Sequence, residues 1–535
     1  MDQPEARRIT GRHLLLRGPG VAIELPVSLE PTRVAERAAQ ACAALGWPCD
    51  LHQRVHKGGA SLAMAARFDL LETACDLLDW AAGDEPLSPE RVERLRQDAD
   101  DEARPRLMAC LGAMGDRASF WDDDGLTVGL GHRSQTWELH RLPRPDELPD
   151  GGRVPVAMVT GTNGKTTTTR MLARIAHTAG FIVGHTSSDA VVIDGVEVER
   201  GDWTGPGAAR RVLRDPSVTL AVLETARGGL MRRGLVLEGS DVAVLTNVDV
   251  DHIGEWGLWD AADMARAKLV IADGLKAGGI VVANARSALL IDGVRDLLKR
   301  RPDLQLRWFA DGELADAHAD EHTLYLDDTP LLPLAEIPLT FAGTARYNVE
   351  NALAAALGAQ ALGLHRDQIA AGLRALRPTV ADSRGRMNRF VLPNGAIALV
   401  DFAHNPDGLR RLGQAVAAWP GTRRTVLLGQ AGDRSDDDLI AFAQAALLAK
   451  PDRVVLKELI KKLRGRQAGD VPAVLHRALV GGGLPPAAIE AAGDELDAVR
   501  YALDTAHPGE LLFLLIHLDL QPVLDELEAR GAVEL

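Results

Sequence analysis

Short apolar runs alternate with segments of helical spacing through the middle of the chain. Four of these runs predict buried strands, at 156–159, 220–223, 242–245 and 280–282. Residues 166–176, after the first run, have the spacing of a helix. Such alternation is typical of a parallel sheet with helices on both faces. We therefore expect an α/β domain in which the polar residues that follow each strand line a ligand-binding edge.

The flanking regions predict two further domains. After residue 384, apolar runs at 396–400, 425–428, 453–456 and 511–515 predict a smaller, Rossmann-like α/β domain. Before residue 150 we expect strand, loop and strand over 9–25, helices over 34–45 and 62–82, a helix or helix pair over 89–111, and a last strand over 137–141. Prolines and glycines between 143 and 152 are typical of a linker. The expected domains are 1–150 (α+β), 153–383 and 384–535.

Composition narrows the class of protein. The chain has 535 residues, of which 46% are hydrophobic and 25% charged, as in soluble globular proteins. Its formal net charge of -15 argues against nucleic acid or an anionic membrane as the main partner. No run of about twenty apolar residues and no signal peptide is present, so we expect a cytoplasmic protein. The four cysteines lack metal-ligand spacing and predict no catalytic role.

The stretch from residue 156 to 169 carries the strongest chemical signal. A strand, a glycine loop and a helix N-terminus follow one another, which places free backbone N–H groups and the helix dipole where they stabilise a phosphate. We expect Lys165 to reach the outer phosphates of ATP and the Thr166 hydroxyl to hold Mg²⁺. The match to the general P-loop pattern is incomplete, because Val159 stands at the first glycine position. A glycine-rich turn that binds nothing is the alternative. The residues expected to contact the nucleotide are Gly161, Thr162, Asn163, Gly164, Lys165, Thr166 and Thr167.

Carboxylates and a histidine follow the next two expected strands. Glu224 comes directly after the second run, and Asp249, Asp251 and His252 follow the third. A carboxylate at a strand end suits Mg²⁺, and an imidazole beside carboxylates suits a second metal or its water shell. Each residue alone is more simply a satisfied loop side chain. Their placement at successive strand ends predicts a functional site.

These motifs together resemble the Mur ligase family, whose members use ATP to join a carboxylate to an amine. The resemblance implies that Glu224 and His252 hold Mg²⁺. It also implies that Lys268, in an expected helix over 261–270, carries a carbamate and helps to hold a second metal. Spacing alone would favour a surface lysine. The implied fold is a three-domain α/β architecture around a central P-loop ATPase sheet.

Two later segments extend the resemblance to the nucleotide. Asn348 and Asn351 match the family asparagines that meet the adenine, although Tyr347 stands where many members have histidine. The stretch Asp-Phe-Ala-His-Asn-Pro from residue 401 matches the family signature Asp-Tyr-Ala-His-Asn-Pro. The resemblance therefore implies that Arg386, Asp401 and His404 contact the nucleotide.

Within the family, the chain is similar to the Mur-ligase-like part of cyanophycin synthetases. The stretches 201–209 and 223–230 have counterparts there, and so does a lysine-glutamate stretch that ends in Arg-Gly-Arg at 464–466. In this chain the spacer 459–463 is apolar and basic rather than acidic, so the amine substrate need not be arginine. A solvated basic loop is the alternative. The candidate substrate contacts are Asp202, Thr204, Arg227, Asn405, Asp433, Arg434, Lys457 and Glu458.

The resemblance implies an ATP-dependent ligase that forms an amide or isopeptide bond. ATP would phosphorylate a carboxylate, and an amine would then displace phosphate from the acyl phosphate. We expect ATP, two Mg²⁺ ions and a carbamylated lysine, with small-molecule or peptide carboxylate and amine substrates. A plain P-loop ATPase or switch, a non-catalytic scaffold, and a natural-product or cell-wall amide ligase are the alternatives.

The region before the P-loop adds one expectation about partners. Cyanophycin synthetases carry an ATP-grasp domain between their N-terminal and Mur-like regions, and the residues before 155 are too few to contain it. We therefore expect side-chain-type amide bonds only, made alone, with a separate backbone-forming ligase, or in a homo-oligomer.

Overall fold

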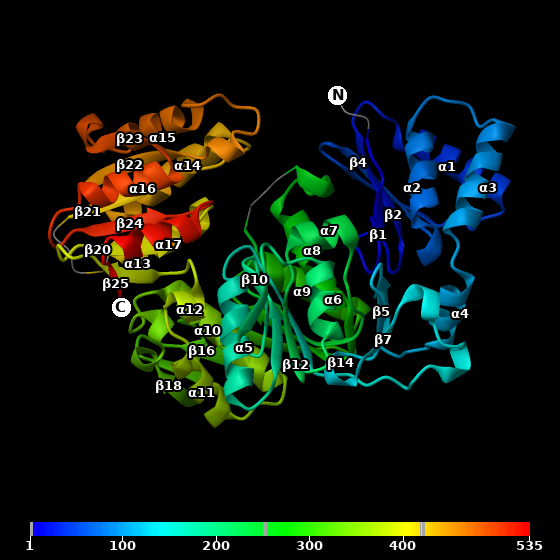
Figure 1. The fold of residues 1–535 in the computed structure, drawn as a ribbon, viewed down its shortest axis with the longest axis horizontal. Coiled ribbons are helices and arrows are strands. Elements are labelled where there is room, and N and C mark those ends of the chain that lie inside the picture. The colour runs from blue at the N-terminus through cyan, green and yellow to red at the C-terminus, as the bar shows by residue number, and fades with distance from the viewer. Residues whose placement is uncertain (1–3, 250–253, 418, 420–422) are drawn as a thin grey trace. The chain divides into compact units, whose positions relative to one another are not determined.

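A computed structural model describes residues 4–249, 254–417, 419 and 423–535. The chain divides into two compact units (Figure 1). The first contains residues 1–318, 326–329 and 352–372, and the second contains 319–325, 330–351 and 373–535. Within these parts of the chain, no helix combines the length and the apolar character that crossing a membrane requires.

An eleven-stranded sheet holds the central region, in the order β11-β10-β9-β12-β8-β13-β14-β15-β16-β17-β18. Its middle strands, from β9 to β15 in that order, pair in parallel. All four strands expected here are confirmed. The strands are β8 (Val156–Thr160), β9 (Val183–Thr186), β10 (Ala190–Ile193), β11 (Val196–Arg200), β12 (Leu220–Glu224), β13 (Ser240–Leu245), β14 (Leu275–Asn284), β15 (Gln305–Asp311), β16 (Ala317–Ala319), β17 (Thr323–Leu326) and β18 (Thr329–Pro333).

The middle strands are continuous apolar runs because both of their faces are buried. Every residue of β8 and of β12 is buried. One large core joins apolar side chains of β8, β12 and β13 to those of several helices. The helices of this region are α5 (Lys165–Thr178), α6 (Pro206–Arg214), α7 (Arg227–Arg233), α8 (Ala261–Asp273), α9 (Ala288–Arg300), α10 (Arg346–Ala361), α11 (Arg366–Ala375) and α12 (Val380–Ser383).

The N-terminal region begins with a four-stranded antiparallel sheet in the order β1-β2-β4-β3. Helices α1 to α3 lie on one side of it, and α7 and α8 lie on the other (Figure 1). A three-stranded sheet, β5-β6-β7, follows. The elements are β1 (Arg7–Ile9), β2 (Gly20–Pro26), α1 (Pro31–Leu45), β3 (Leu51–His56), β4 (Gly59–Ala65), α2 (Leu71–Ala82), α3 (Pro89–Glu102), α4 (Pro105–Ala113), β5 (Ser119–Asp122), β6 (Gly125–Val128) and β7 (Gln135–Trp137).

Two expectations for this region are wrong in part. The helix expected over 62–82 begins only at Leu71, because the chain before it forms β4 between β2 and β3. Leu62 and Met64 alternate along β4 and pack against the helices, and a short apolar run is compatible with either period. The strand expected over 137–141 ends at Trp137, and a short 3₁₀ turn follows. The expected helix pair over 89–111 is confirmed as α3 and α4.

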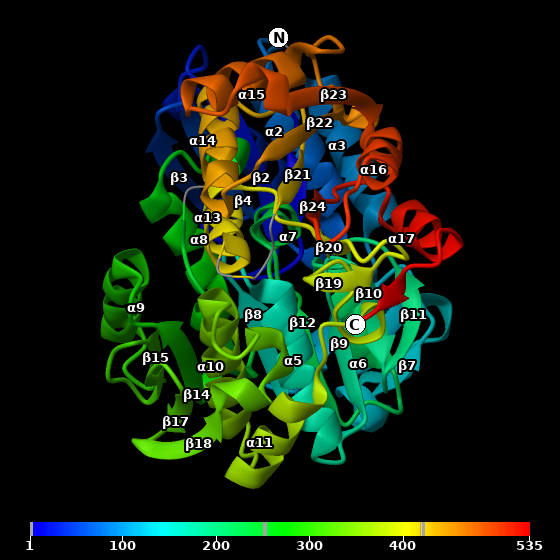
Figure 2. The same ribbon diagram turned by 90° about the vertical axis from the view of Figure 1, so that its left-hand side faces the viewer.

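The C-terminal region is a seven-stranded sheet in the order β23-β22-β21-β24-β20-β19-β25. Its four expected strands are confirmed, and they pair in parallel. Helices α13 to α15 cover one face and α16 and α17 the other (Figure 2), each with its own apolar core. The elements are β19 (Asn388–Val391), β20 (Ile397–Asp401), α13 (Pro406–Ala417), β21 (Arg424–Leu428), α14 (Asp436–Ala446), β22 (Arg453–Glu458), α15 (Asp470–Gly481), β23 (Ile489–Asp494), α16 (Glu495–Asp504), β24 (Leu511–Leu515), α17 (Leu520–Ala529) and β25 (Val533–Glu534).

Candidate active site

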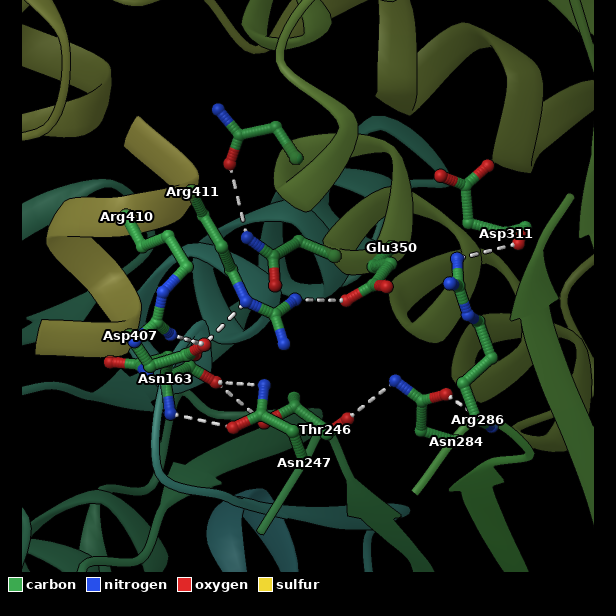
Figure 3. A network of polar contacts seen from close by, with 12 residues as sticks. Asn163, Thr246, Asn247, Asn284, Arg286, Asp311, Glu350, Asp407, Arg410 and Arg411 are labelled. Carbon is green, nitrogen blue, oxygen red and sulfur yellow. Dashed lines mark hydrogen bonds and ion pairs between the residues drawn. The ribbon is translucent and has the colours of Figure 1, made fainter. Parts of the chain in front are cut away.

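The glycine loop after β8 is held in place by the end of the neighbouring strand β13 (Figure 3). Asn163 N donates to Asn247 Oδ1 over 2.8 Å, and Thr246 Oγ1 donates to Asn163 O over 2.7 Å. A Cβ on Gly161 would come within 1.8 Å of Thr246 Oγ1, so only glycine permits this approach. The close contact with β13 gives a physical reason for a glycine at this position.

The network continues across the carboxyl edge of the sheet (Figure 3). Asn284 Nδ2, at the end of β14, donates to Thr246 O over 3.0 Å. Arg286 N donates to Asn284 Oδ1, and Arg286 Nη1 donates to Asp311 O at the end of β15. Sequence reasoning did not find Asn284 or Arg286, although each follows a strand of this sheet. The loop is therefore held by side chains at the end of β13, which Asn284 at the end of β14 supports in turn, and Arg286 links this network to the backbone of β15.

Lys165 and the helix α5 complete the phosphate cradle. Gly164 adopts a left-handed conformation with φ 83°, and α5 begins at the next residue. Lys165 Nζ donates to Thr162 O over 2.9 Å, within the same loop. The loop therefore holds the ammonium at the N-terminus of α5, where an anion would also be stabilised. Thr167 is buried in the first turn of this helix.

A buried cluster of oxygen atoms lies directly beside this loop. Thr166 Oγ1 is 2.8 Å from Glu224 Oε2, to which it donates, and 3.1 Å from Ser188 Oγ. Ser188 N also donates to Glu224 Oε2 over 3.2 Å. Thr166 is 6% exposed and Glu224 3% exposed. Ser188 was missed, although the polar stretch after β9 follows the strand next to β12 and could have indicated it.

The chemistry of this cluster fits Mg²⁺. One carboxylate and two hydroxyls are hard oxygen donors, and Mg²⁺ in nucleotide sites keeps several waters and takes other ligands from phosphates. Within the described parts of the chain, no group of three or more histidine, cysteine or carboxylate side chains could hold a metal. The oxygen cluster around Thr166 is therefore suited to a metal that the nucleotide also ligates.

Two further residues, His252 and Lys268, were expected to help to hold the metals. His252 lies outside the described residues, together with Asp251. Lys268 lies on α8 and is 5% exposed, so it is not the surface lysine that its spacing alone would favour. Burial of an ammonium is costly unless a charge partner or a modification compensates it. The expected carbamate and the metal role of Lys268 stay predictions.

Three loops meet beside the oxygen cluster. Trp203 N donates to Ser187 O over 3.0 Å, and Ala226 N donates to Thr204 O over 3.2 Å. These bonds join the loop after β9, the loop before α6 and the loop after β12. Thr204 Oγ1 donates to Asp202 Oδ1 over 2.8 Å. The expected substrate contacts Asp202 and Thr204 therefore lie on a loop that is tied to the two loops carrying Ser188 and Glu224.

Arg227 stands at the start of α7, three residues after Glu224. Its Nη2 is 2.5 Å from Glu255 Oε2, and its side chain is 10% exposed. The ion pair fixes the guanidinium close to the end of β12. A role for Arg227 toward a substrate carboxylate stays a prediction.

The second unit contains expected nucleotide residues at the end of β20 and just before β19. Asp401 Oδ1 accepts from Ala403 N and Oδ2 from Met387 N, at 2.8 Å and 2.9 Å. Burial raises the pKa of Asp401, and the Arg386 guanidinium and backbone N–H donors oppose that rise. Arg386 lies 4.7 Å from the centre of the Phe402 ring. Asp401 and Arg386 are therefore neighbours at the end of β20.

The remaining residues of this signature have local partners. The His404 ring is 5.0 Å from Phe402. Asn405 Oδ1 accepts from Gly408 N over 2.8 Å, so Asn405 caps α13. Arg411 in α13 pairs with Glu350 over 2.8 Å and with Asp407 over 2.9 Å (Figure 3). Helix capping accounts for Asn405 without a substrate, and its expected substrate contact stays a prediction.

Asn348 and Asn351 are both buried at the start of α10. Asn348 Nδ2 donates to Leu339 O over 2.8 Å, and Asn351 Nδ2 donates to Asn348 Oδ1 over 3.0 Å. The Tyr347 hydroxyl, one residue earlier, is buried and has no hydrogen-bond partner. The pair of asparagines is thus already ordered by protein contacts, and the adenine role stays a prediction.

Lys457 does not meet the expectation of a substrate contact. Its side chain is fully buried, and its ammonium donates to Glu495 Oε1 and to Leu515 O. Burial alone would raise the pKa of Glu495, but Lys457 and other donors lower it to about 2. The carboxylate also accepts from the backbone N–H groups of 517–519. In this structure Lys457 is a buried cation whose ammonium is already held by protein groups.

The loops after β21 and β22 are tied to each other. Arg464 pairs with Asp433, and Arg466 donates to Gly432 O over 3.0 Å and to Arg434 O over 2.7 Å. Glu458 Oε2 accepts from Gly469 N over 2.8 Å. Asp433, Arg434 and Glu458 therefore lie in one linked pair of loops, and their substrate roles stay predictions.

Comparison with known proteins places these features in a family. The model of the Mur ligase middle domain matches residues 159–359, and that of the Mur ligase glutamate ligase domain matches 385–515. The cyanophycin synthetase of Synechocystis sp. is 40% identical over 365 residues, which cover 66% of this chain and 41% of that protein. The chain spans less than half of the length of the cyanophycin synthetases that it matches.

A relative of more similar length is a UDP-N-acetylmuramoyl-L-alanyl-D-glutamate–2,6-diaminopimelate ligase of Xanthomonas oryzae pv. oryzae. It is 30% identical over 369 residues, which cover 66% of this chain and 70% of that protein. Solved structures confirm the expected fold. MurF from Acinetobacter baumannii has a TM-score of 0.53 at 22% identity, with 70% of this chain and 77% of that chain covered. Folylpolyglutamate synthase from Mycobacterium tuberculosis has a TM-score of 0.51 at 19% identity, with 71% of this chain and 91% of that chain covered. This chain belongs to the Mur ligase family.

Proposed function

We propose that this chain is an ADP-forming, ATP-dependent ligase that joins a carboxylate to an amine in an amide or isopeptide bond. The observation that carries the proposal is the buried contact of Thr166 with Glu224 and Ser188, directly beside the phosphate cradle. Hydroxyl and carboxylate oxygens at this place serve a nucleotide-bound Mg²⁺, which a plain glycine turn would not need. Membership of a ligase family supports the same conclusion.

The residues of the loop act by positioning and by charge. The backbone N–H groups at the start of α5 bind the phosphates of ATP, and Lys165 stabilises the charge that develops as the terminal phosphoryl group moves. Mg²⁺ supplies further charge neutralisation when it is bound at Thr166 and Glu224. The acceptor carboxylate attacks the terminal phosphorus, and ADP leaves. The amine then attacks the acyl carbon, its proton is lost, and phosphate departs.

The acceptor site belongs to the loops joined by Thr204 and Ala226, with Arg227 holding a substrate carboxylate. A carbamate on Lys268 and a second Mg²⁺ are the finer parts of this proposal. Exclusion of water protects the acyl phosphate from hydrolysis. The reaction consumes ATP, so we place the enzyme in the cytoplasm.

Similarity to the cyanophycin synthetases supports only the chemical class of the two substrates. We infer that the acceptor is a small-molecule or peptide carboxylate. The amine substrate need not be arginine. Lys461 of the basic spacer pairs with Asp519 over 3.3 Å, and Arg464, directly after the spacer, pairs with Asp433, so both acidic groups already have cationic partners. We also propose that the bonds are of the side-chain type, made with a separate ligase or a second copy of the chain as partner.

Release of ADP against a panel of carboxylate and amine pairs tests the proposal. We expect release that requires both substrates and Mg²⁺. Release of ADP with neither substrate present would indicate a plain ATPase, and a folded protein that binds no ATP would indicate a scaffold. Incubation with ATP, Mg²⁺, aspartate, arginine and a short aspartyl primer tests the bond type. Growth of the primer backbone by this chain alone would refute the proposed restriction.

A further inference from the structure

One face of the N-terminal sheet carries a row of polar side chains where a core face would carry apolar ones. The register places Ser61 on β4 opposite both Glu24 on β2 and Arg54 on β3, so the three side chains share one face. Ser61 Oγ donates to Glu24 Oε2 over 2.6 Å, and Arg7 pairs with Glu24 Oε1 over 2.7 Å. The other face packs its apolar residues against α1 and α2. The polar face therefore needs a partner of its own.

That partner is the segment 254–263 of the central region, which leads into α8. Arg54 Nη1 donates to Asp263 Oδ1 over 2.6 Å, and Arg54 Nη2 donates to Gly257 O. A Cβ on Gly257 would lie 2.3 Å from Ser61 Oγ and 2.7 Å from Glu24 Oε2. The backbone of the segment thus rests directly on the polar row.

Two tryptophans of the segment are held by the same sheet. The Trp259 ring stacks on His56 at 6.0 Å, and a Cβ on Gly58 would come within 2.0 Å of that ring. Arg7 lies 4.8 Å from the centre of the Trp256 ring. Trp256 itself has φ 56°, a conformation that side-chain-bearing residues rarely adopt. The sheet therefore supports a backbone path that the segment would not favour alone.

The apolar residues of this segment are linked to the P-loop through Val248 and Asp249. Leu258, Met264 and Ala267 form a small core with Met231 of α7, against which Leu14, Val248 and Trp256 pack. The residue after Val248, Asp249, donates its N–H to Thr162 Oγ1 over 2.9 Å. The segment is thus packed against the N-terminal region, and through Val248 and Asp249 it is linked to the loop that cradles the phosphate.

The segment is also joined to the candidate acceptor and metal residues. Glu255 holds Arg227, close to the end of β12. Asp263 lies in the first turn of α8, with its N–H capped by Asp260, and Lys268 lies further along this helix. Any shift of the segment would therefore move both Arg227 and the start of α8.

We propose that the N-terminal sheet is a brace for the segment 254–263, and that Arg54 is a positioning residue for the ligase site. Arg54 does not touch a reacting atom; it acts through Gly257 and Asp263 on the arrangement of α8 and Arg227. The proposal assigns a role to a region that lies outside both matched family domains. The catalytic part of the proposal rests on the proposed function, whereas the bracing itself does not.

The test compares Arg54→Ala with Arg33→Ala in the full chain. Arg33 is a matched control because it belongs to the same region and pairs on the surface with Asp84. We expect Arg54→Ala to lower kcat for ADP release by about a hundredfold, as misplacement of a catalytic site commonly does, while KM for ATP changes little. Arg54→Lys and added guanidinium ion should each restore part of kcat. A folded Arg54→Ala with the kcat of Arg33→Ala would overturn the proposal.

Hydrogen exchange of peptides from 254–270 gives a second reading that needs no reaction. Faster exchange there in Arg54→Ala, with no change in Arg33→Ala, supports the brace even if the wild type releases no ADP, which would count against the proposed function alone. Unchanged exchange would overturn the brace. If Arg54→Ala does not fold, Gly58→Ala replaces it, because its new Cβ must displace Trp259. A folded Gly58→Ala with unchanged exchange and unchanged kcat would also overturn the proposal.

Discussion

Replacement of Thr166 by valine removes one hydroxyl from the centre of the candidate metal site. Valine has nearly the size of threonine, so residue 166 keeps its buried position in the first turn of α5. The change deletes the 2.8 Å contact from Thr166 Oγ1 to Glu224 Oε2. It also deletes an oxygen that we expect to bind Mg²⁺. The buried carboxylate is left with less compensation for its charge.

The size of the effect follows from the kind of contact. A hydrogen bond to a charged group contributes about 1.5–3 kcal/mol, and both groups here are nearly inaccessible to solvent. If the Thr166 hydroxyl contributes the same free energy to binding the metal as to holding Glu224, the Mg²⁺ concentration at half-saturation should rise by about 10- to 150-fold. Thr166→Ser keeps the hydroxyl and should stay within about threefold of the wild type, a difference of well under 1 kcal/mol.

Thr169 offers a matched control on the same helix. It is fully buried, and its hydroxyl has no hydrogen-bond partner. Thr169→Val is thus the same chemical change without loss of a contact, and it should be neutral or slightly stabilising. The assay is a Mg²⁺ titration of ADP release at saturating ATP, with calorimetric binding of a non-hydrolysable ATP analogue beside it. If folded Thr166→Val and Thr169→Val share one Mg²⁺ midpoint and one rate, the metal assignment of Thr166 is wrong.

Four further predictions concern buried or charged groups. Lys165→Ala should lower ADP release by about a hundredfold or more while the fold is kept, and near-normal release by a folded variant would refute its role. Lys268→Ala should lose activity and regain part of it with added short carboxylates; a metal-bound map with an unmodified amine would argue against the carbamate. Lys457→Met should cost about 3–5 kcal/mol of unfolding free energy in urea titrations, and Lys457→Met combined with Glu495→Gln should recover part of it; equal stability of the single and double variants would contradict the buried pair. Burial, aided by Arg7, lowers the pKa of His13 to about 3. Unfolded chains then bind a proton that the native state does not, so this contribution to stability is lost as pH falls below 6.5, by about 2 kcal/mol at pH 5; His13→Gln should flatten that dependence, and an unchanged pH profile would refute it.

The strands of both α/β regions could be predicted because a fully buried strand leaves a continuous apolar run in the sequence. The P-loop and Glu224 could also be predicted, since each directly follows such a run. Ser188 was not, because it is an ordinary serine in a polar loop, and only the pairing of β9 with β12 brings it to Glu224. Sequence distance hides this neighbour, and sheet order reveals it.

Lys457 shows the opposite failure. A lysine beside a glutamate in a family-like stretch suggested a substrate contact, but the strand β22 carries this side chain into the interior. Its true partner, Glu495, starts α16 and is 38 residues away. Likewise, the polar face of the N-terminal sheet could not be predicted, because the short runs of β4 fit a helix as well as a strand. In each case tertiary pairing, rather than local pattern, decides the role.

Trp256 and Trp259 give the protein its own spectroscopic label at the segment 254–263. The chain has nine tryptophans, and these two alone belong to that segment. One ring lies under a guanidinium and the other against an imidazole, so each fluorine nucleus of a fluorotryptophan-labelled sample would experience a distinct local field. Single tryptophan-to-phenylalanine changes would assign the two resonances. Occupancy of the nucleotide and acceptor sites could then be followed in solution through two side chains that are not among the candidate ligand contacts.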